Sequence, residues 1–395
     1  MSVHVAAAIP LAIWIYLLCA RGGFWRVSGQ APGALQEARV AAAAHPAQRL
    51  AVIIPARNEA PVIAAALRSL LEQQFSGSIE IFVIDDGSTD GTAEAACAVA
   101  AQAGGNRLLH VLRGAPLQPG WTGKLWAMSQ GVTAAAALDA DYLLFTDADI
   151  HHEPDSVARL IGLAETTGSD LVSFMAKLST RTLAERCLIP AFVFFFFMIY
   201  PPAWVLDSTA RTAAAAGGCM LIRPRALTRA GGLAAIRDQL IDDCALARAV
   251  KSSGGRLWLG LTDRVRSLRG YGSFAEIGAM ISRTAFAQLR HSYWLLAATL
   301  LGLALTYLLP PLLLVTRAPI AATLGAGAWL LMALAYLPMV RFYRAAWPWS
   351  LALPLIAAFY AAATLSSAVQ YGLGRGGHWK GRVQDARAQI SRHSP

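Results

Sequence analysis

Pairs of acidic residues occur at several points of this 395-residue chain, and two of these pairs directly follow apolar runs. Asp147 and Asp149 follow Tyr142–Thr146 with one residue between them, and Asp85 and Asp86 follow Ile79–Ile84. Neighbouring carboxylates repel each other unless a cation lies between them, and Mg²⁺ and Mn²⁺ prefer oxygen ligands. The spacing of Asp147 and Asp149 therefore predicts a divalent metal site that also engages substrate phosphates.

A third acidic pair, Asp242–Asp243, leads into a helical pattern. Either it is a helix start that negative charge stabilises, or one acid is a general base that takes the proton from an attacking hydroxyl. Lys124 also stands at a predicted helix start, where its charge and the free N–H groups suit phosphate; the alternative is a solvated lysine. His151 and His152 either extend the metal shell or are ordinary loop residues.

The elements that must position these residues alternate between strand and helix. Apolar strands followed by amphipathic helices predict βαβ units and a mostly parallel sheet, which binds ligands at the carboxyl ends of its strands. The expected strands are 50–55, 79–84, 108–112, 142–146 and 171–176, and the expected helices are 59–73, 89–103, 124–138 and 155–167.

Two of the loops at these strand ends are candidates for donor binding. The polar loop after the first strand contains Pro55, Arg57 and Glu59. Asp85 and Asp86 can accept hydrogen bonds from a base or a ribose, although Asp-Gly-Ser-Thr is also an ordinary turn that caps a helix.

The composition indicates a membrane protein. Hydrophobic residues make up 56% and charged residues 15% of the chain, which excludes a disordered or fibrous protein and argues against an ordinary soluble enzyme. The net charge of +10 favours basic flanks beside anionic lipid rather than nucleic acid. Five scattered cysteines without CxxC spacing fit a reducing compartment and argue against a zinc site.

The apolar runs divide the chain into five parts. Residues 1–26 are predicted to be a transmembrane anchor with its N-terminus outside, because Arg21 follows the apolar run instead of preceding it. Three further runs, about 293–315, 320–340 and 349–373, are each long enough to cross a bilayer. These three runs make up the C-terminal helices (291–373). The remaining parts are a linker (27–49), the α/β domain (50–290) and a basic tail (374–395).

Two features of this division are not settled by the sequence. If residues 188–206 crossed the membrane once, Asp149 and Asp243 would lie on opposite sides. An interfacial helix with Phe194–Phe197 in lipid is therefore expected, with a buried core helix as the alternative. Three C-terminal crossings would also place the basic tail outside, so either one run is a re-entrant hairpin or the charge rule fails here.

Taken in this order, the motifs resemble those of glycosyltransferase family 2, with a GT-A fold and membrane segments. Val52–Glu59 looks like that family's opening strand, Asp85–Asp86 like its uridine-contacting acids, and Asp147–Ala–Asp149 like its DxD motif. By this resemblance Asp243 is the catalytic base with Asp242 in support, and Lys124 faces the diphosphate of a UDP-sugar. The resemblance also implies Mg²⁺ or Mn²⁺ as cofactor and inversion at the anomeric carbon.

Within the family, the segments 189–196, 214–222 and 241–248 resemble the hopanoid-associated branch. A Gln-x-x-Arg-Trp motif of the processive members is only partly matched, because Arg283 is present while the Gln and Trp are not. Arg283 is thus expected on the acceptor or diphosphate side. The resemblance implies a non-processive inner-membrane enzyme with a cytoplasmic domain and a lipid acceptor. The alternatives are a nucleotidyltransferase and an inactive membrane protein with a transferase-like domain.

Overall fold

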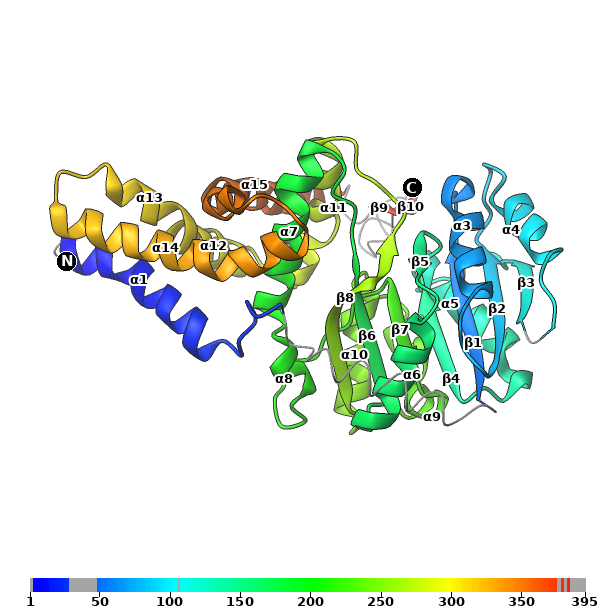
Figure 1. The fold of residues 1–395 in the computed structure, drawn as a ribbon. Helices are drawn as coiled ribbons and strands as arrows, with labels where there is room; N and C mark the ends of the chain where they lie inside the picture. The colour runs from blue at the N-terminus through cyan, green and yellow to red at the C-terminus, as the bar shows by residue number, and fades with distance from the viewer. Residues whose placement is uncertain (1–2, 28–47, 106, 375–377, 380–381, 384–395) are drawn as a thin grey trace.

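A mixed eight-stranded sheet forms the centre of the larger part of the molecule (Figure 1). The computed structural model describes residues 3–27, 48–105, 107–374, 378–379 and 382–383. The strand order is β3-β2-β1-β4-β7-β6-β8-β5, and only β7 and β5 run antiparallel to their neighbours. This confirms the expected Rossmann-like α/β class. The strands are β1 (Arg49–Ala56), β2 (Ser78–Asp85), β3 (Arg107–Arg113), β4 (Tyr142–Thr146), β5 (Ile150–His152), β6 (Leu171–Lys177), β7 (Cys219–Ile222) and β8 (Leu257–Ser267).

Alternate residues of β1 point into two separate cores, because successive side chains of a strand face opposite sides of the sheet. Leu50, Val52 and Ile54 pack in one core with helices α3, α4 and α6, while Ala51 and Ile53 pack in the other with α5 and α10. Helices thus cover both faces, which explains the near-continuous apolar runs of the strands. The covering helices are α3 (Ala60–Leu71), α4 (Thr92–Ala100), α5 (Gly123–Ala134), α6 (Ser156–Thr167), α9 (Pro224–Arg229) and α10 (Asp242–Ser252).

The direction in which successive strands are added to the sheet reverses at β1. From β1 the chain steps to β2 and β3 on one side, and then returns to β4 on the other side of β1. Ligands of open α/β sheets bind outside the carboxyl ends of the strands at such a switch point. This position lies between the ends of β1 and β4, where Pro55 and Asp147 are found.

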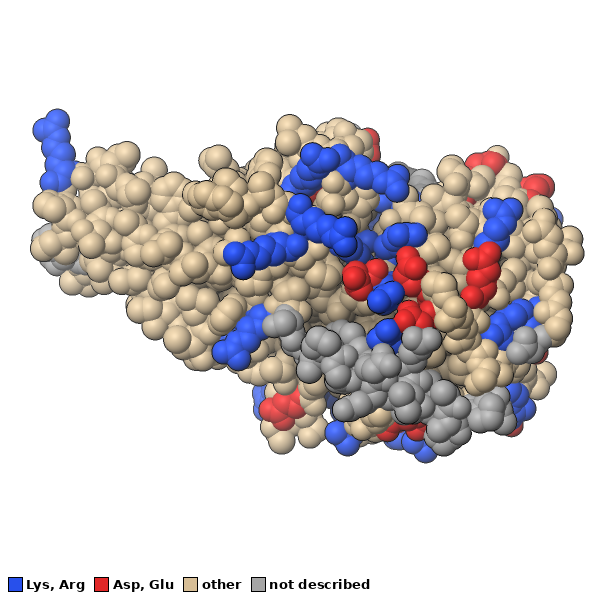
Figure 2. All heavy atoms as spheres, in the orientation of Figure 1, with Lys and Arg blue, Asp and Glu red and all other residues tan. Residues whose placement is uncertain are grey.

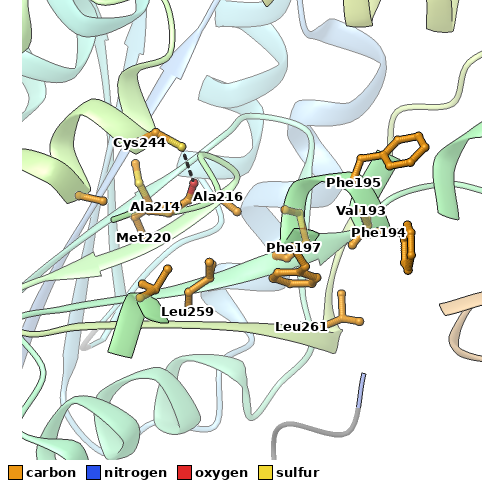
Figure 3. Close-up of a cluster of buried hydrophobic side chains, with 14 of the residues drawn as sticks. Val193, Phe194, Phe195, Phe197, Ala214, Ala216, Met220, Cys244, Leu259 and Leu261 are labelled. Atoms are coloured by element: carbon orange, nitrogen blue, oxygen red, sulfur yellow. Dashed lines mark hydrogen bonds between the residues drawn. The ribbon is translucent and has the colours of Figure 1, made fainter. Parts of the chain in front are cut away.

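Helix α7 (Leu183–Ile199) joins the sheet to the C-terminal apolar helices, and its burial corrects one expectation. Phe194, Phe195 and Phe197 are all buried, so they do not face lipid as predicted. Phe197 lies toward Leu261 on the sheet side (Figure 3), while Phe194 and Phe195 contact Tyr336 and Tyr360 of the C-terminal apolar helices. Three of the four phenylalanines therefore belong to the core of the junction, while Phe196 is half-buried and Ile199 is exposed. Helix α8 (Pro202–Leu206) follows it.

Three C-terminal segments are long and apolar enough to cross a membrane, as predicted: Tyr293–Leu314, Pro319–Phe342 and Trp347–Gly372. The first comprises α12 (Tyr293–Leu303), a π-helical turn (Ala304–Leu308) and α13 (Leu309–Leu314); the second is α14. Helix α1 (Val3–Ala20) lies along α14, and these helices project together from the sheet domain (Figure 1). The anchoring role of α1 stays a prediction. Most of the predicted linker and tail lies outside the described residues.

The last apolar segment does not run straight. Its first part, η4 (Trp347–Ala352), packs beside α14, and Trp329 in the middle of α14 donates a hydrogen bond to the Leu351 carbonyl at 3.1 Å. Helix α15 (Leu353–Gly372) then ends beside the start of α12. The two ends are so close that a Cβ added to Gly372 would lie 3.4 Å from the Tyr293 hydroxyl. The segment therefore turns back within the helical layer, as a re-entrant hairpin does.

Candidate active site

A polar cavity of about 300 Å³ opens at the carboxyl edge of the sheet. Figure 2 shows acidic and basic side chains gathered where the sheet domain meets the apolar helices. Seven of the predicted site residues line this cavity: Pro55, Glu59, Lys124, Asp147, Asp149, Asp242 and Arg283. Residues from five segments far apart in the chain are thus brought to one place.

Lys124 lies at the centre of the charge arrangement. Its Nζ is 2.9 Å from Asp147 Oδ1 and 3.2 Å from Asp242 Oδ2, so it links the Asp-Ala-Asp motif to the start of α10. Burial opposes the charge, but the two carboxylates outweigh it and raise the pKa of Lys124 well above its usual range. Lys124 is consequently a permanent cation. It sits in the first turn of α5, whose N-cap Thr122 accepts a hydrogen bond from Leu125 N.

The two acids of the Asp-Ala-Asp motif each meet a different cation. Asp147 pairs with Lys124, whereas Asp149 Oδ2 accepts a hydrogen bond from Ser267 Oγ at 2.8 Å and lies 3.6 Å from Arg269 Nε. Burial is the main cause that raises the pKa of Asp147, with Lys124 opposing it. Two carboxylates lining one cavity fit a hard divalent cation. Among the described residues, no group of three or more His, Cys, Asp or Glu could hold a metal, so further ligands would come from phosphate or water.

His152 is a buried structural residue beside the Asp-Ala-Asp motif. Its Nε2 lies 3.0 Å from Thr146 Oγ1 and its Nδ1 lies 3.4 Å from Ser156 Oγ, within a buried network. Burial lowers the pKa of His152 to about 3, so the ring is neutral. Thr146 Oγ1 also donates to Gly218 O at 2.8 Å, which fixes the end of β4 against the loop before β7. His151 instead lies near Glu153, 3.7 Å away, and neither histidine lines the cavity.

Arg269 and Tyr271 line the cavity but were not found from the sequence. Arg269 forms an ion pair with Glu59 as well as with Asp149, and these acids raise its pKa although burial opposes them. Both residues lie just after β8, which runs parallel to β6. The sequence Leu268–Arg–Gly–Tyr–Gly272 after an apolar strand was the available signal.

A buried carboxylate holds this loop in place. Glu185 is fully buried and accepts hydrogen bonds from Tyr271 N and Arg181 N at 2.6 Å each. It also accepts from Thr182 N at 2.9 Å and from Ser179 Oγ at 3.1 Å. Burial would raise the pKa of Glu185, but these donors lower it overall. The first turn of α7 thereby fixes the backbone that carries Arg269 and Tyr271.

The two acids at the start of α10 have different surroundings. Asp242 lines the cavity and faces Lys124. Asp243 lies behind it and accepts hydrogen bonds from Gly217 N at 2.8 Å and Cys244 N at 2.7 Å. A Cβ on Gly217 would lie 3.2 Å from Asp243 Oδ2 and 3.3 Å from Lys124 Nζ, so the three residues meet closely. Burial and the Asp242 charge raise the pKa of Asp243 to about 6.

The remaining predicted residues form a separate cluster beside the cavity. Arg57 donates to the Asp86 carbonyl, and its Nη1 lies 3.5 Å from Asp86 Oδ2. Asp85 Oδ1 accepts from Ser88 N at 3.2 Å, and Asn58 N donates to Ser88 Oγ at 3.0 Å. These contacts tie the ends of β1 and β2 together. Arg57, Asp85 and Asp86 do not line the cavity itself.

Comparisons with known proteins give one consistent family. Residues 51–200 match the model of the family described as "Glycosyl transferase family 2". Over 120 residues the chain is 36% identical to 4,4'-diaponeurosporenoate glycosyltransferase of Staphylococcus aureus strain RF122, and 37% identical to that of strain MRSA252. Each match covers 30% of this chain and 29% of the relative, so less than a third of the relatives' length is spanned.

A solved structure resembles nearly the whole chain. The mannosyltransferase PcManGT from Pyrobaculum calidifontis, solved in complex with GDP-Man and Mn²⁺, has a TM-score of 0.52 and 20% sequence identity. The likeness covers 90% of this chain and 98% of that chain. At this identity the match supports the fold, including the helices that follow the sheet domain.

Proposed function

Because residues 51–200 match the glycosyl transferase family 2 model and the fold resembles that of a mannosyltransferase, we propose that this chain transfers a sugar from a nucleotide-diphosphate sugar to a lipid acceptor at the membrane. UDP-sugars are the preferred donors in this proposal, and GDP-sugars are the alternative, since the structural neighbour was solved with GDP-Man. Two acceptors should be tested first. One is a hopanoid-related lipid, and the other is 4,4'-diaponeurosporenoate, which appears in the names of the relatives.

One observation carries the proposal: Lys124, Asp147, Asp149 and Asp242 line a single cavity at the switch point of the sheet, next to apolar helices. Lys124 and Arg269 supply positive charge for the diphosphate, and preorganised charge of this kind stabilises a leaving group. Asp147 and Asp149 would hold Mg²⁺ or Mn²⁺, which supplies Lewis-acid stabilisation of the departing diphosphate when bound.

Asp243 is proposed as the base. Its raised pKa suits a carboxylate that accepts a proton near neutral pH. Asp242, held by Lys124, would orient its neighbour and keep the cation in place. The acceptor oxygen then attacks the anomeric carbon directly as the diphosphate leaves. A single displacement inverts the configuration, and one transfer per acceptor makes the enzyme non-processive.

Charge at the helix ends supports a cytoplasmic domain in the inner membrane. Arg21, Arg290 and Arg341 lie at the ends of α1, α11 and α14, whereas Arg317 lies in the turn between α13 and α14, which Figure 1 shows at the end away from the sheet domain. Basic residues concentrate on the cytoplasmic side of membrane helices. A re-entrant final segment would end on that same side at Gly372, and this is compatible with the charge rule for the basic residues that follow in the sequence.

The test is transfer by membranes that contain the full chain. Membranes are incubated with radiolabelled UDP-sugars and GDP-mannose, and labelled lipids are identified by mass spectrometry. Asp149→Ala serves as the inactive control, and Arg248→Gln, an exposed change outside the cavity, as the active one. The proposal is supported if a lipid is labelled by wild-type membranes at a level above the Asp149→Ala background. Label in neither, with both proteins folded, contradicts it.

A further inference from the structure

Arg283 differs from the other cavity cations, because it has no acidic partner among the described residues. Lys124 pairs with Asp147 and Asp242, and Arg269 pairs with Glu59 and Asp149. Within the part of the chain that the structure describes, Arg283 makes no ion pair or hydrogen bond. Burial raises the pKa of the nearby Tyr271 phenol, and the charge of Arg283 opposes this rise. Its guanidinium is therefore available to an anionic group of a substrate.

Arg283 belongs to α11 (Phe274–Gln288). An apolar groove of about 380 Å³ lies between this helix and α15. Small side chains on both helices leave the space open, and the Phe274 and Phe359 rings, 6.2 Å apart, lie at one end. Ala279 and Ala362 are exposed in it. Since α15 belongs to a segment apolar enough to enter a membrane, this groove is placed where lipid chains are available.

The groove and the cavity share α11. Ala279 lines the groove and Arg283, four residues later, lines the cavity, so both lie on one stripe of the helix. A chain lying in the groove would therefore have its head at Arg283. The apolar walls favour a hydrocarbon chain, because removing apolar surface from water is favourable. The unpaired guanidinium favours a negatively charged head.

We propose that the α11–α15 groove binds the apolar chain of the acceptor and that Arg283 binds its anionic head, a carboxylate or a phosphate. This assignment rests on the proposed transferase function and specifies its substrate as an anionic amphiphile. In the reaction an acceptor oxygen bonds to the anomeric carbon, and the bond from that carbon to the diphosphate oxygen breaks. A hydroxyl acceptor gives its proton to Asp243, whereas an attacking carboxylate or phosphate oxygen releases none.

Photo-crosslinking tests the site without requiring transfer. The full chain in nanodiscs is labelled with a diazirine-bearing C16 carboxylic acid, the matching monophosphate or the matching alcohol, and labelled peptides are mapped. Ala362→Trp fills the groove, and Leu355→Trp, at an exposed position of α15 outside it, is its control. Arg283→Gln removes the head contact, and Arg290→Gln is its control.

We expect labelling of α11 and α15 by the two anionic probes, lost in Ala362→Trp and retained in Leu355→Trp. Arg283→Gln should weaken binding of the better anionic probe about tenfold, which corresponds to about 1.4 kcal/mol, without affecting the alcohol. The stronger of the two anionic probes identifies the head group. Equal labelling by acid, phosphate and alcohol, or labelling unaffected by Ala362→Trp, overturns the assignment. If labelling follows the groove while no sugar is transferred, the proposed function fails instead.

Discussion

Lys124 Nζ lies 2.9 Å from Asp147 Oδ1, so the first acid of the Asp-Ala-Asp motif is already paired with a cation from the N-terminus of α5. Three carboxylates, those of Asp147, Asp242 and Asp243, share the field of this lysine. Its charge holds together acids that would otherwise repel one another. The proposed donor site is therefore preorganised by the protein's own cation.

Lys124→Met should disable the donor site. Loss of the ammonium leaves Asp147 and Asp242 without their cation and removes positive charge from the diphosphate site. We expect turnover to fall by about 10²–10³, as for other preorganised charge-stabilising groups, and donor KM to rise. Steady-state kinetics of membranes with Lys124→Met and Lys124→Arg check this. Arg keeps the charge and should retain more activity; equal loss in both would mean that shape matters more than charge.

Metal dependence is expected to follow Asp149. Asp149→Asn keeps the hydrogen-bonding shape toward Ser267 but removes a hard anionic ligand. Transfer should become negligible in this variant and in wild type treated with EDTA, and Mn²⁺ or Mg²⁺ should restore only the wild type. Calorimetric titration with nucleoside diphosphate, with and without metal, provides a readout independent of turnover. Full activity in excess EDTA would contradict the metal site.

The two acids of α10 should differ in effect. Asp243→Asn removes the proposed base and should lower turnover by about 10²–10⁴ while donor affinity stays near that of wild type. Asp242→Asn should weaken donor binding more than it lowers turnover, because Asp242 contacts Lys124. Kinetics together with donor affinity for each variant separate the roles. If Asp242→Asn is inactive and Asp243→Asn nearly normal, the cavity-lining acid is the base.

The pH profile should report on Asp243. Burial and the neighbouring Asp242 raise its pKa to about 6, and a base must be ionised to accept a proton. The transfer rate should consequently rise with pH up to about 6 and level off above it. This acidic limb should be absent from the residual activity of Asp243→Asn. A profile that is flat from pH 5 to 8 in the wild type would exclude Asp243 as the rate-limiting base.

Glu185→Gln should destabilise the protein, because an amide N–H₂ would face backbone donors such as Tyr271 N. An unsatisfied buried group costs about 1–3 kcal/mol in the free energy of unfolding. The pKa of Glu185 is lowered in the folded state, so its contribution is present above the ordinary value of 4.5 and is lost as the pH falls through the folded-state value. Thermal unfolding at pH 7 and pH 4 should show a smaller difference between variant and wild type at pH 4.

Local patterns were sufficient to predict part of this structure. Apolar strands ending in acids placed Asp147 at the carboxyl edge of β4, and the strand–helix alternation predicted the sheet. Arg269 was missed because its position depends on the pairing of β8 with β6, which joins residues far apart in the chain. The burial of Phe194 was missed because an apolar helix has the same composition in lipid and in a protein core. The turn before α15 was left open because length alone does not distinguish a hairpin from a crossing.

The hydrogen bond from Tyr271 N to Glu185 joins residues 86 positions apart, and this separation has a consequence for folding. Contacts distant in sequence form late, because closing a long loop costs entropy before the contact stabilises it. A chain in which α7 has not docked can already have its β1–β2 pair, whose partners are much closer in sequence, yet it lacks the anchored Arg269 beside Asp149. Affinity for the proposed donor should therefore report whether the domain has assembled completely on its C-terminal helices, which helix content alone cannot do.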